Sequence, residues 1–238
     1  MPIYQYLIFD VDDTLLDFYA AFLTAQRNIA EHLEIELSQE YYDTDEKCGW
    51  RAWEECGLEK TEEKDVQENY HAYYYQYLRK HFEYLLEAYG KVCDVKELVE
   101  CYLKSISSSK VMKEPSTLSV YARLSQRYQL VLATNGIDRM QRERITDFLP
   151  YTHRIYVSEG IGFIKPTEDF YNYIMSDLRC RPEECLMIGD SITNDIVGAK
   201  AVGMNVCYYN IKGKHKPENV LVDFEINSIN DLVQILLQ

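Results

Sequence analysis

The residues best suited to chemistry lie directly after the first apolar run of the chain, in the segment YLIFDVDDT. Three carboxylates, Asp10, Asp12 and Asp13, occupy four positions there. Residues two apart on a strand face the same way, so Asp10 and Asp12 leave the sheet together and Asp13 points elsewhere. Their mutual repulsion calls for compensating charge. A hard cation such as Mg²⁺, which prefers oxygen ligands, is suited to supply it.

Other polar residues follow later apolar runs. Thr134 and Asn135 follow QLVLA, Asp190 follows ECLMIG with Asp195 shortly after, and Lys165 lies in the loop GFIKP between these two segments. Ligands of parallel α/β sheets bind beyond the carboxyl ends of the strands, so we expect these residues to meet the N-terminal acids at one site. Each segment alone could be a capped turn or a solvated lysine. It is their joint order along the chain that favours a shared site.

The combined set suits one chemical group. Acids able to hold a cation, the Lys165 ammonium and the donors of Thr134 and Asn135 together match the charge and oxygen atoms of a phosphoryl group. We therefore expect Thr134, Asn135 and Lys165 to bind phosphate.

The apolar pattern predicts the elements that would position these residues. Residues 4–11 form a strand whose apolar end is nearly continuous, which is typical of a parallel strand covered on both faces. Residues 17–109 show helical periodicity and no convincing strand. From Pro115 onward, strands alternate with helices, which predicts an α/β fold with a doubly wound parallel sheet. The expected organisation is a core of residues 1–16 and 110–238, with a helical cap domain, residues 17–109, inserted after the first strand.

The elements expected after Pro115 can be placed along the chain. The strands are predicted at 129–134, 153–160, 184–191 and 204–210, and the helices at 115–128, 139–149, 167–178, 194–203 and 229–237.

Composition limits the classes of function. The chain has 238 residues with 47% hydrophobic residues, which allows a sizeable core. A net charge of -14 argues against a nucleic-acid or anionic-membrane partner. The residues expected to bind phosphate make a small phosphorylated metabolite the expected partner. Seven cysteines without paired spacing are typical of free thiols in a reducing compartment. No apolar run has the length of a membrane span and no signal segment is present, so a cytoplasmic location is expected. The oligomeric state is not indicated.

At these residues the chain resembles the haloacid dehalogenase-like (HAD) hydrolase superfamily in its phosphatase form. The pattern D-x-D-x-T corresponds to residues 10–14, the hydroxyl that ends the second strand to Thr134, the later lysine to Lys165, and the acidic segment G-D-x(3,4)-D to residues 189–195. The resemblance covers essentially the whole chain and implies a Rossmann-like HAD core. The insertion at 17–109 resembles the helical, C1-type cap of the family.

The resemblance implies a two-step phosphoryl transfer. Asp10 would attack phosphorus to form an aspartyl-phosphate, and Asp12 would protonate the leaving oxygen and then deprotonate the attacking water. Mg²⁺ would be held by Asp10, by the main-chain carbonyl of Asp12 and by Asp190. Asp195 would be a further metal ligand or would hold Lys165. Asp12 also argues against a dehalogenase, because halide leaves without a proton.

A narrower resemblance is to the pyrimidine 5'-nucleotidase-like branch, carried by FDVDDTLLDF, GWRAWEE and VSEGIGFIKPTEDFYNY. It implies a nucleoside monophosphate substrate. Trp50, Arg51 and Trp53 are then candidates for selecting the substrate, by stacking on a base and by contact with a guanidinium. The alternative is that the tryptophans fill the core of the helical bundle.

Two other functions remain open at this stage. A sugar-phosphate phosphatase or phosphomutase of the same superfamily would use the same residues. A phospho-acceptor signalling module also uses clustered Asp, a Thr or Ser, a Lys and Mg²⁺, but such modules are about half this length and lack the helical insertion.

Overall fold

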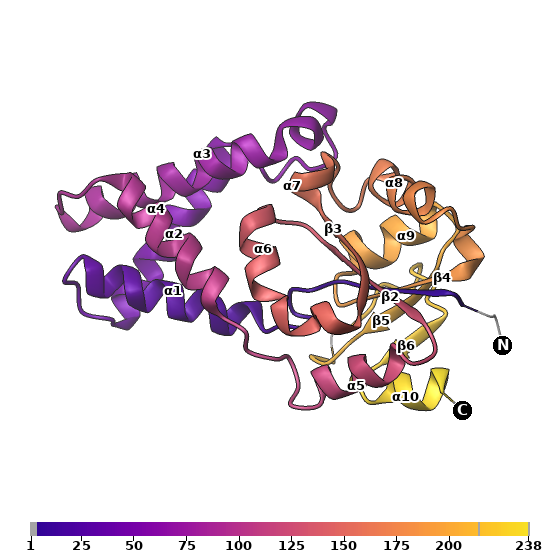
Figure 1. The fold of residues 1–238 in the computed structure, drawn as a ribbon. Helices are drawn as coiled ribbons and strands as arrows, with labels where there is room; N and C mark the ends of the chain where they lie inside the picture. The colour runs from indigo at the N-terminus through magenta and orange to yellow at the C-terminus, as the bar shows by residue number, and fades with distance from the viewer. Residues whose placement is uncertain (1–3, 214, 238) are drawn as a thin grey trace. The chain divides into compact units, whose positions relative to one another are not determined.

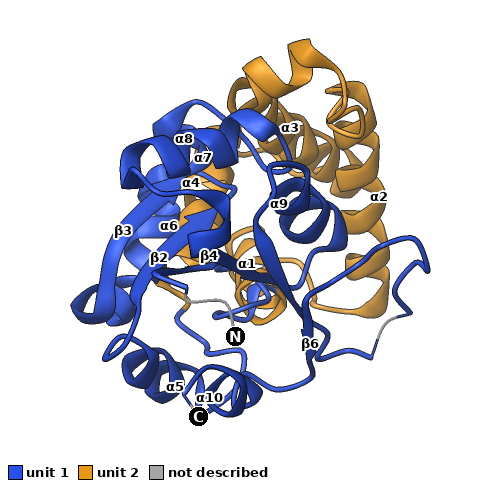
Figure 2. Ribbon diagram, turned by 90° about the vertical axis from the view of Figure 1, so that its right-hand side faces the viewer, with its two compact units in different colours: residues 1–18, 110–238 blue, residues 19–109 orange. Residues whose placement is uncertain are grey.

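The computed structural model describes residues 4–213 and 215–237. The chain forms two compact units, one of residues 1–18 and 110–238 and one of residues 19–109 (Figure 2). No helix in the described ranges is both long enough and apolar enough to cross a membrane.

A six-stranded sheet forms the centre of the first unit, in the order β3-β2-β1-β4-β5-β6 (Figure 1). All neighbouring strands are parallel. The N-terminal strand therefore lies in the middle of the sheet, between two strands that come much later in the chain. The strands are β1 (Tyr6–Phe9), β2 (Gln129–Thr134), β3 (Thr152–Val157), β4 (Cys185–Gly189), β5 (Asn205–Tyr209) and β6 (Phe224–Ile226).

Helices cover both faces of this sheet (Figure 1). One apolar core lies between the sheet and α5, η1 and α10, and the other between the sheet and α8 and α9. The helices of this unit are α5 (Thr117–Leu124), α6 (Asp138–Arg144), α7 (Ser158–Ile161), α8 (Glu168–Leu178), α9 (Gly198–Ala201) and α10 (Asp231–Leu236), with 3-10 turns η1 (Thr146–Tyr151) and η2 (Pro182–Glu184) and a π-helical turn η3 (Ile192–Val197).

The two cores explain the nearly continuous apolar run of β1. Leu7 and Phe9 belong to one core, whereas Tyr6 and Ile8 belong to the other. A strand that is buried on both faces has no polar face, so its sequence does not alternate. The predicted doubly wound parallel sheet is confirmed.

The second unit is helical. Its helices are α1 (Phe18–His32), α2 (Gln39–Glu55), α3 (Lys64–Tyr89) and α4 (Val95–Ser108). The Ser38 hydroxyl accepts a hydrogen bond from the Tyr41 amide at the start of α2, and Gly90 ends α3 with a φ of 58°. Ser is a preferred N-cap residue and Gly is the residue that tolerates this left-handed conformation at a helix end.

Several predicted boundaries after Pro115 were wrong. The helix expected to begin at Pro115 begins at Thr117, because the Thr117 hydroxyl accepts a bond from the Glu114 amide and forms a turn first. The helix expected at 139–149 is divided into α6 and η1, which contains Pro150. The strand expected through Gly160 ends at Val157, where α7 begins. The helix expected at 194–203 comprises η3 and α9.

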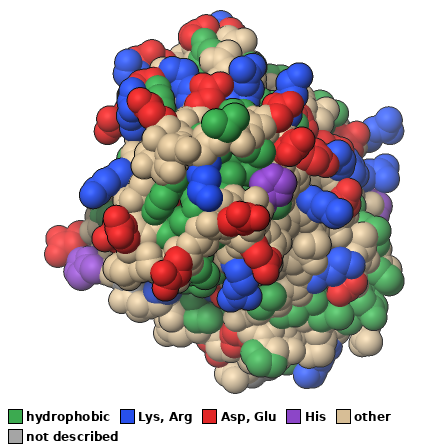
Figure 3. All heavy atoms as spheres, turned by 90° about the vertical axis from the view of Figure 1, so that its left-hand side faces the viewer, with side chains coloured by type: hydrophobic (Ala, Val, Ile, Leu, Met, Phe, Trp, Pro, Cys, Tyr) green, Lys and Arg blue, Asp and Glu red, His purple; other side chains and the backbone are tan. Residues whose placement is uncertain are grey.

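The surface carries mixed charge on the face drawn in Figure 3. Red acidic and blue basic side chains are interspersed there among hydrophobic ones, and neither sign gathers into one continuous area of the described residues in that view.

Candidate active site

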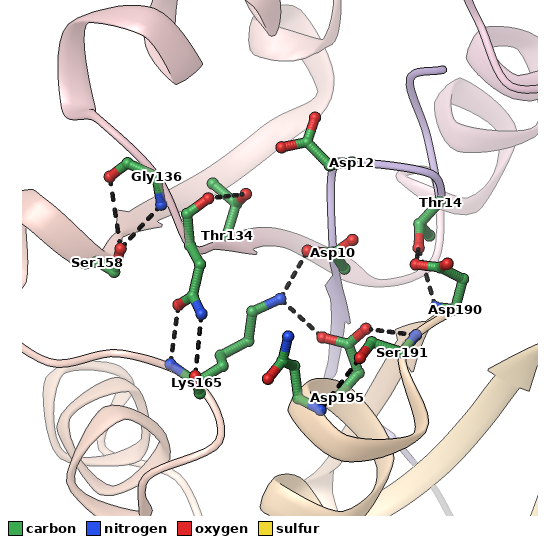
Figure 4. Close-up of polar contacts among 12 residues, drawn as sticks. Asp10, Asp12, Thr14, Thr134, Gly136, Ser158, Lys165, Asp190, Ser191 and Asp195 are labelled. Atoms are coloured by element: carbon green, nitrogen blue, oxygen red, sulfur yellow. Dashed lines mark hydrogen bonds and ion pairs between the residues drawn. The ribbon is translucent and has the colours of Figure 1, made fainter. Parts of the chain in front are cut away.

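The polar residues expected at one site lie together in the first unit, beyond the carboxyl ends of β1, β2 and β4 (Figure 4). They surround a cavity of about 260 Å³. Its lining comprises Asp10, Asp12, Asp13, Phe18, Thr134, Asn135, Lys165, Asp190, Ser191, Asn194 and Asp195.

Lys165 lies at the centre of this site. Its Nζ donates to Asp10 Oδ1 at 2.6 Å and to Asp195 Oδ1 at 2.7 Å (Figure 4). All three side chains are almost completely buried. The other oxygen of Asp195 accepts a hydrogen bond from the Ser191 amide at 3.0 Å. Lys165 therefore shares its charge between the acid that follows β1 and the acid in η3.

Asn135 fixes the main chain at Lys165. The Asn135 side-chain amide donates to the Lys165 carbonyl at 2.9 Å, and its oxygen accepts from the Lys165 amide at 2.8 Å. The side-chain oxygen and one N–H of the amide thus hold the lysine loop, in addition to the donation to an anion that was expected of Asn135. Asn135 thus acts on the site through the placement of Lys165.

The buried acids of this site are only partly compensated by Lys165. Burial raises the pKa of Asp10 well above its ordinary value, Lys165 opposes that rise, and the Asp195 and Asp190 carboxylates add to it. Burial alone would lower the pKa of Lys165. The Asp10 and Asp195 carboxylates outweigh this effect and raise the pKa above its ordinary value, so the lysine remains charged. One ammonium compensates two buried acids only in part.

The donor set fits a hard divalent cation. Carboxylate oxygens of Asp10, Asp190 and Asp195 lie within 4.8 Å of one another. Thr14 places Asp190, because the Thr14 hydroxyl accepts from the Asp190 amide at 3.1 Å (Figure 4). Oxygen ligands from a few carboxylates are what Mg²⁺ uses in proteins, and its charge would relieve the repulsion among them.

Gly189 allows this packing of acids. A Cβ at this position would lie 2.3 Å from Asp195 Oδ2. Any other residue at the end of β4 would displace the Asp195 carboxylate from Lys165. Gly189 is therefore required because the Asp195 side chain lies so close to its backbone.

The side chain of Asp12 is held by two residues that the sequence reasoning missed. Gln141 Nε2 donates to Asp12 Oδ2 at 2.9 Å and to the Thr134 hydroxyl at 2.6 Å. The completely buried Arg144 forms a short ion pair with Asp12 Oδ1 and donates to Gln141 Oε1 at 3.1 Å. Asp12 is thus connected to Thr134 through one amide and charge-compensated by a guanidinium.

A signal for these two residues exists in the sequence. Ile137, Met140, Gln141 and Arg144 follow the spacing of one helical face, and all four are buried. A polar amide and an arginine on an otherwise apolar face are costly unless they bind a partner.

We predict that Gln141→Leu will lower kcat/KM roughly 10- to 100-fold, because a misplaced catalytic group can cost about that much. Leucine retains the size of glutamine but removes the donor that places Asp12 and Thr134. The family resemblance implies that Asp12 activates water, so intact-mass measurement should also show more phosphorylated enzyme during turnover. Gln26→Leu is the matched control when both variants are assayed with an aryl phosphate, which has no base to bind beside Asp45, since Gln26 is a buried glutamine that donates to the Asp45 carboxylate in the other unit. Equal kinetic losses in both variants would contradict the positioning role.

The candidate selectivity residues lie in the helical unit and have different surroundings. Trp50 and Trp53 line a cavity of about 290 Å³, and Trp50 is 59% exposed. Arg51 is not part of that lining: its Nε lies 3.1 Å from Glu55, and its guanidinium lies 3.7 Å above the Tyr84 ring. The remaining lining residues are Phe22, Asp45, Glu46, Gly49, Tyr77 and His81.

The fold and the site together define a doubly wound α/β hydrolase. The chain belongs to the haloacid dehalogenase-like hydrolase family, whose sequence pattern matches residues 4–203. The family resemblance stated from the motifs is thereby confirmed.

Relatives within this family support the assignment. The chain is 31% identical to HAD-hydrolase YfnB of Bacillus subtilis over 99% of this chain and 97% of that protein. The crystal structure of YfnB bound to magnesium matches with a TM-score of 0.81 and 29% identity, covering 98% of each chain. Pyrimidine 5'-nucleotidase PynA of Streptococcus pneumoniae is 26% identical over 98% of this chain and 95% of its own. Glyceraldehyde 3-phosphate phosphatase of Methanocaldococcus jannaschii is 27% identical over 66% of this chain and 72% of its own.

Proposed function

We propose that the protein is a Mg²⁺-dependent phosphatase of small phosphomonoesters that acts through an aspartyl-phosphate, with nucleoside monophosphates as its substrates. The observation that carries this proposal is the buried Lys165, bound to both Asp10 and Asp195 beside a third acid, Asp190. A centre with this concentration of opposite charges suits a dianionic group and a divalent cation better than a neutral substrate.

The reaction follows from the positions of two acids. An Asp10 oxygen attacks phosphorus, the bond from phosphorus to the leaving oxygen breaks, and Asp12 gives its proton to that oxygen. Asp12 then takes a proton from water as the water oxygen attacks phosphorus, which releases phosphate and regenerates Asp10. Lys165 and the Thr134 hydroxyl offer donors to the oxygens of the transferring group.

Asp10, Asp190 and the main-chain carbonyl of Asp12 would hold Mg²⁺, with Asp195 assigned first to Lys165. When bound, the cation would neutralise phosphoryl charge and screen Asp10 from the dianion. The crystal structure of YfnB bound to magnesium supports Mg²⁺ as the cation.

The cavity of the helical unit supports the choice of substrate. It combines aromatic walls from Trp50 and Trp53 with a buried polar pair, in which His81 Nε2 lies 2.8 Å from Asp45 Oδ1. A flat heteroaromatic base can stack on such rings and find hydrogen-bonding groups beside them. The similarity to PynA over nearly the whole chain favours a pyrimidine base.

Phosphate release from the purified protein, measured over a panel of phosphomonoesters, tests the proposal. The panel contains pyrimidine and purine nucleoside monophosphates, glyceraldehyde 3-phosphate and an aryl phosphate, each with Mg²⁺ and with excess chelator. We expect the highest kcat/KM with a pyrimidine nucleotide and loss of activity in chelator. A preference for glyceraldehyde 3-phosphate would favour the sugar-phosphate alternative, which the similarity to the Methanocaldococcus enzyme supports. Undiminished turnover in chelator would contradict the metal assignment.

We predict that Trp50→Ala and Trp53→Ala will raise KM for the preferred nucleotide about 5- to 150-fold, the value of one stacked base contact. Turnover of the aryl phosphate should change little. The Trp50 variant is less affected by unfolding, because a side chain that is 59% exposed contributes less to stability.

Two comparisons keep this test decisive. Tyr75→Ala removes an exposed aromatic residue of α3 that does not line the cavity, and it should leave both substrates unaffected. Arg51→Met tests the guanidinium separately from the rings. If folded tryptophan variants lose nucleotide and aryl phosphate activity in equal proportion, the tryptophans do not select the substrate.

A further inference from the structure

A second group of potential metal ligands lies in the helical unit, apart from the acids of the first unit. His32 is the last residue of α1, Cys93 precedes α4, and Glu97 lies in the first turn of α4. Cys93 Sγ lies 3.5 Å from His32 Nε2 and 3.7 Å from Glu97 Oε2, and these last two atoms lie 3.7 Å apart. Three different donor types, nitrogen, sulfur and oxygen, therefore converge within one small triangle.

The distances among these three atoms are close to those between ligands of one tetrahedrally coordinated metal ion. With Zn–S near 2.3 Å and Zn–N and Zn–O near 2.1 Å, tetrahedral angles place the ligand atoms roughly 3.4–3.6 Å apart. The three observed separations are each within a few tenths of an ångström of that range. The distances among the three ligand atoms therefore suit coordination of one ion.

A direct ion pair between His32 and Glu97 explains their separation less well. A hydrogen bond between imidazole and carboxylate is about 2.7–3.2 Å long. His81 and Asp45 in the same unit meet at 2.8 Å, whereas His32 and Glu97 remain 3.7 Å apart. The wider spacing leaves room for an ion between the two groups rather than a proton.

The local sequence holds the ligands in place. The Asp94 side chain caps α4 by accepting from the Lys96 amide at 2.9 Å, which fixes the turn that carries both Cys93 and Glu97. Lys91 Nζ donates to the Glu34 carbonyl at 3.4 Å and connects the same loop to the end of α1. The side chains of His32 and Glu97 are 39% and 63% exposed, so an ion can enter from solvent.

We propose that His32, Cys93 and Glu97 form a second metal site, which binds Zn²⁺ and connects the end of α1 to the start of α4. Thiolate and imidazole ligands select Zn²⁺ over Mg²⁺, and a water would complete the tetrahedron. Binding forms the Zn–S bond and releases the Cys93 thiol proton to solvent. By joining two helix ends far apart in the chain, the ion stabilises the helical unit.

Cobalt substitution tests this site on the full-length protein. Co²⁺ is titrated in the presence of saturating Mg²⁺, which competes for the carboxylate site in the first unit. We expect the near-ultraviolet charge-transfer absorption of a cobalt–thiolate bond, saturating at one equivalent and removed by added Zn²⁺. Carboxylates alone cannot produce this absorption, so the readout is independent of the phosphatase proposal and of activity.

Cys93→Ser should remove the absorption and lower Zn²⁺ affinity at least about 100-fold, since loss of an outer-shell partner already costs about 10- to 100-fold. Cys101→Ser is the matched control, because Cys101 is a half-buried thiol of α4 outside the triangle, and it should retain the signal.

Zn²⁺ should raise the melting temperature of the parent and of Cys101→Ser but not of Cys93→Ser. His32→Gln should also weaken Zn²⁺ binding. This second variant tests the site independently if Cys93→Ser fails to fold. An absorption that survives Cys93→Ser, or no thiolate signal in the parent, would overturn the proposal.

Discussion

Asp10→Asn is expected to lower phosphatase activity by about 10⁴-fold or more, because the amide cannot form the acyl-phosphate and both chemical steps stop. Asp12→Asn should lose roughly 10²–10⁴-fold, the usual contribution of a general acid and base. With a good leaving group, the Asp12 variant can still phosphorylate Asp10, but hydrolysis of that intermediate should be slow. Brief exposure to an aryl phosphate followed by intact-mass measurement should therefore show a phosphoryl adduct on Asp12→Asn and none on Asp10→Asn.

Asp13→Asn provides the matched control for these two variants. Asp13 lines the same cavity but forms its ion pair with Lys113 at 2.6 Å, away from Lys165. Its substitution should retain most of the activity and leave no stable adduct. A phosphoryl adduct on Asp10→Asn, or equal turnover of the Asp10 and Asp12 variants, would contradict the assigned roles.

Much of the fold could be predicted because the apolar pattern follows from burial. The continuous run in β1 and the alternation of strands and helices after Pro115 reflect a sheet covered on both faces. β6 was missed because three residues, one of them the exposed Glu225, carry too little periodicity to mark a strand. It forms only by pairing with β5, a contact that no local pattern encodes.

The placement of the candidate site residues could be predicted in part because several of them follow strand ends. Asp10, Thr134 and Asp190 line one cavity, as the rule for parallel sheets predicts, and Lys165 reaches the same cavity from the loop before α8. Arg144 was missed because nothing in a local motif indicates which distant charge a buried arginine will meet.

The counter-charges of the N-terminal acids illustrate this limit. The sequence suggested a cation as the compensation for the cluster. In the structure each acid also has its own partner: Lys165 for Asp10, Arg144 for Asp12 and Lys113 for Asp13. All three partners lie more than 90 positions away in the chain, so only the folded topology brings them together.

Lys165→Met is expected to have the second large effect, on activity and stability together. Removing one partner of a buried ion pair costs about 3–5 kcal/mol of unfolding free energy, because the charge left behind is unpaired. Loss of the donor to the transferring group should lower kcat/KM by roughly 10²–10³-fold or more. Asp10 and Asp195 would then face each other without an ammonium, so Mg²⁺ should raise the melting temperature of the variant more than that of the parent. Thermal melts with and without Mg²⁺, together with aryl phosphate kinetics, measure both effects.

Lys113→Met separates the role of Lys165 in the site from the general cost of losing a buried lysine. The Lys113 side chain is 8% exposed and pairs with two acids, Asp13 at 2.6 Å and Asp17 at 3.5 Å, much as Lys165 pairs with Asp10 and Asp195. Its removal should destabilise the protein by the same mechanism, yet the melting temperature should respond to Mg²⁺ as in the parent and folded protein should retain most of its turnover. If both lysine variants lose activity and respond to Mg²⁺ equally at temperatures where both are folded, Lys165 contributes only to stability. A larger Mg²⁺ response confined to Lys165→Met would instead place the lysine and the cation in the same electrostatic centre, each partly compensating for loss of the other.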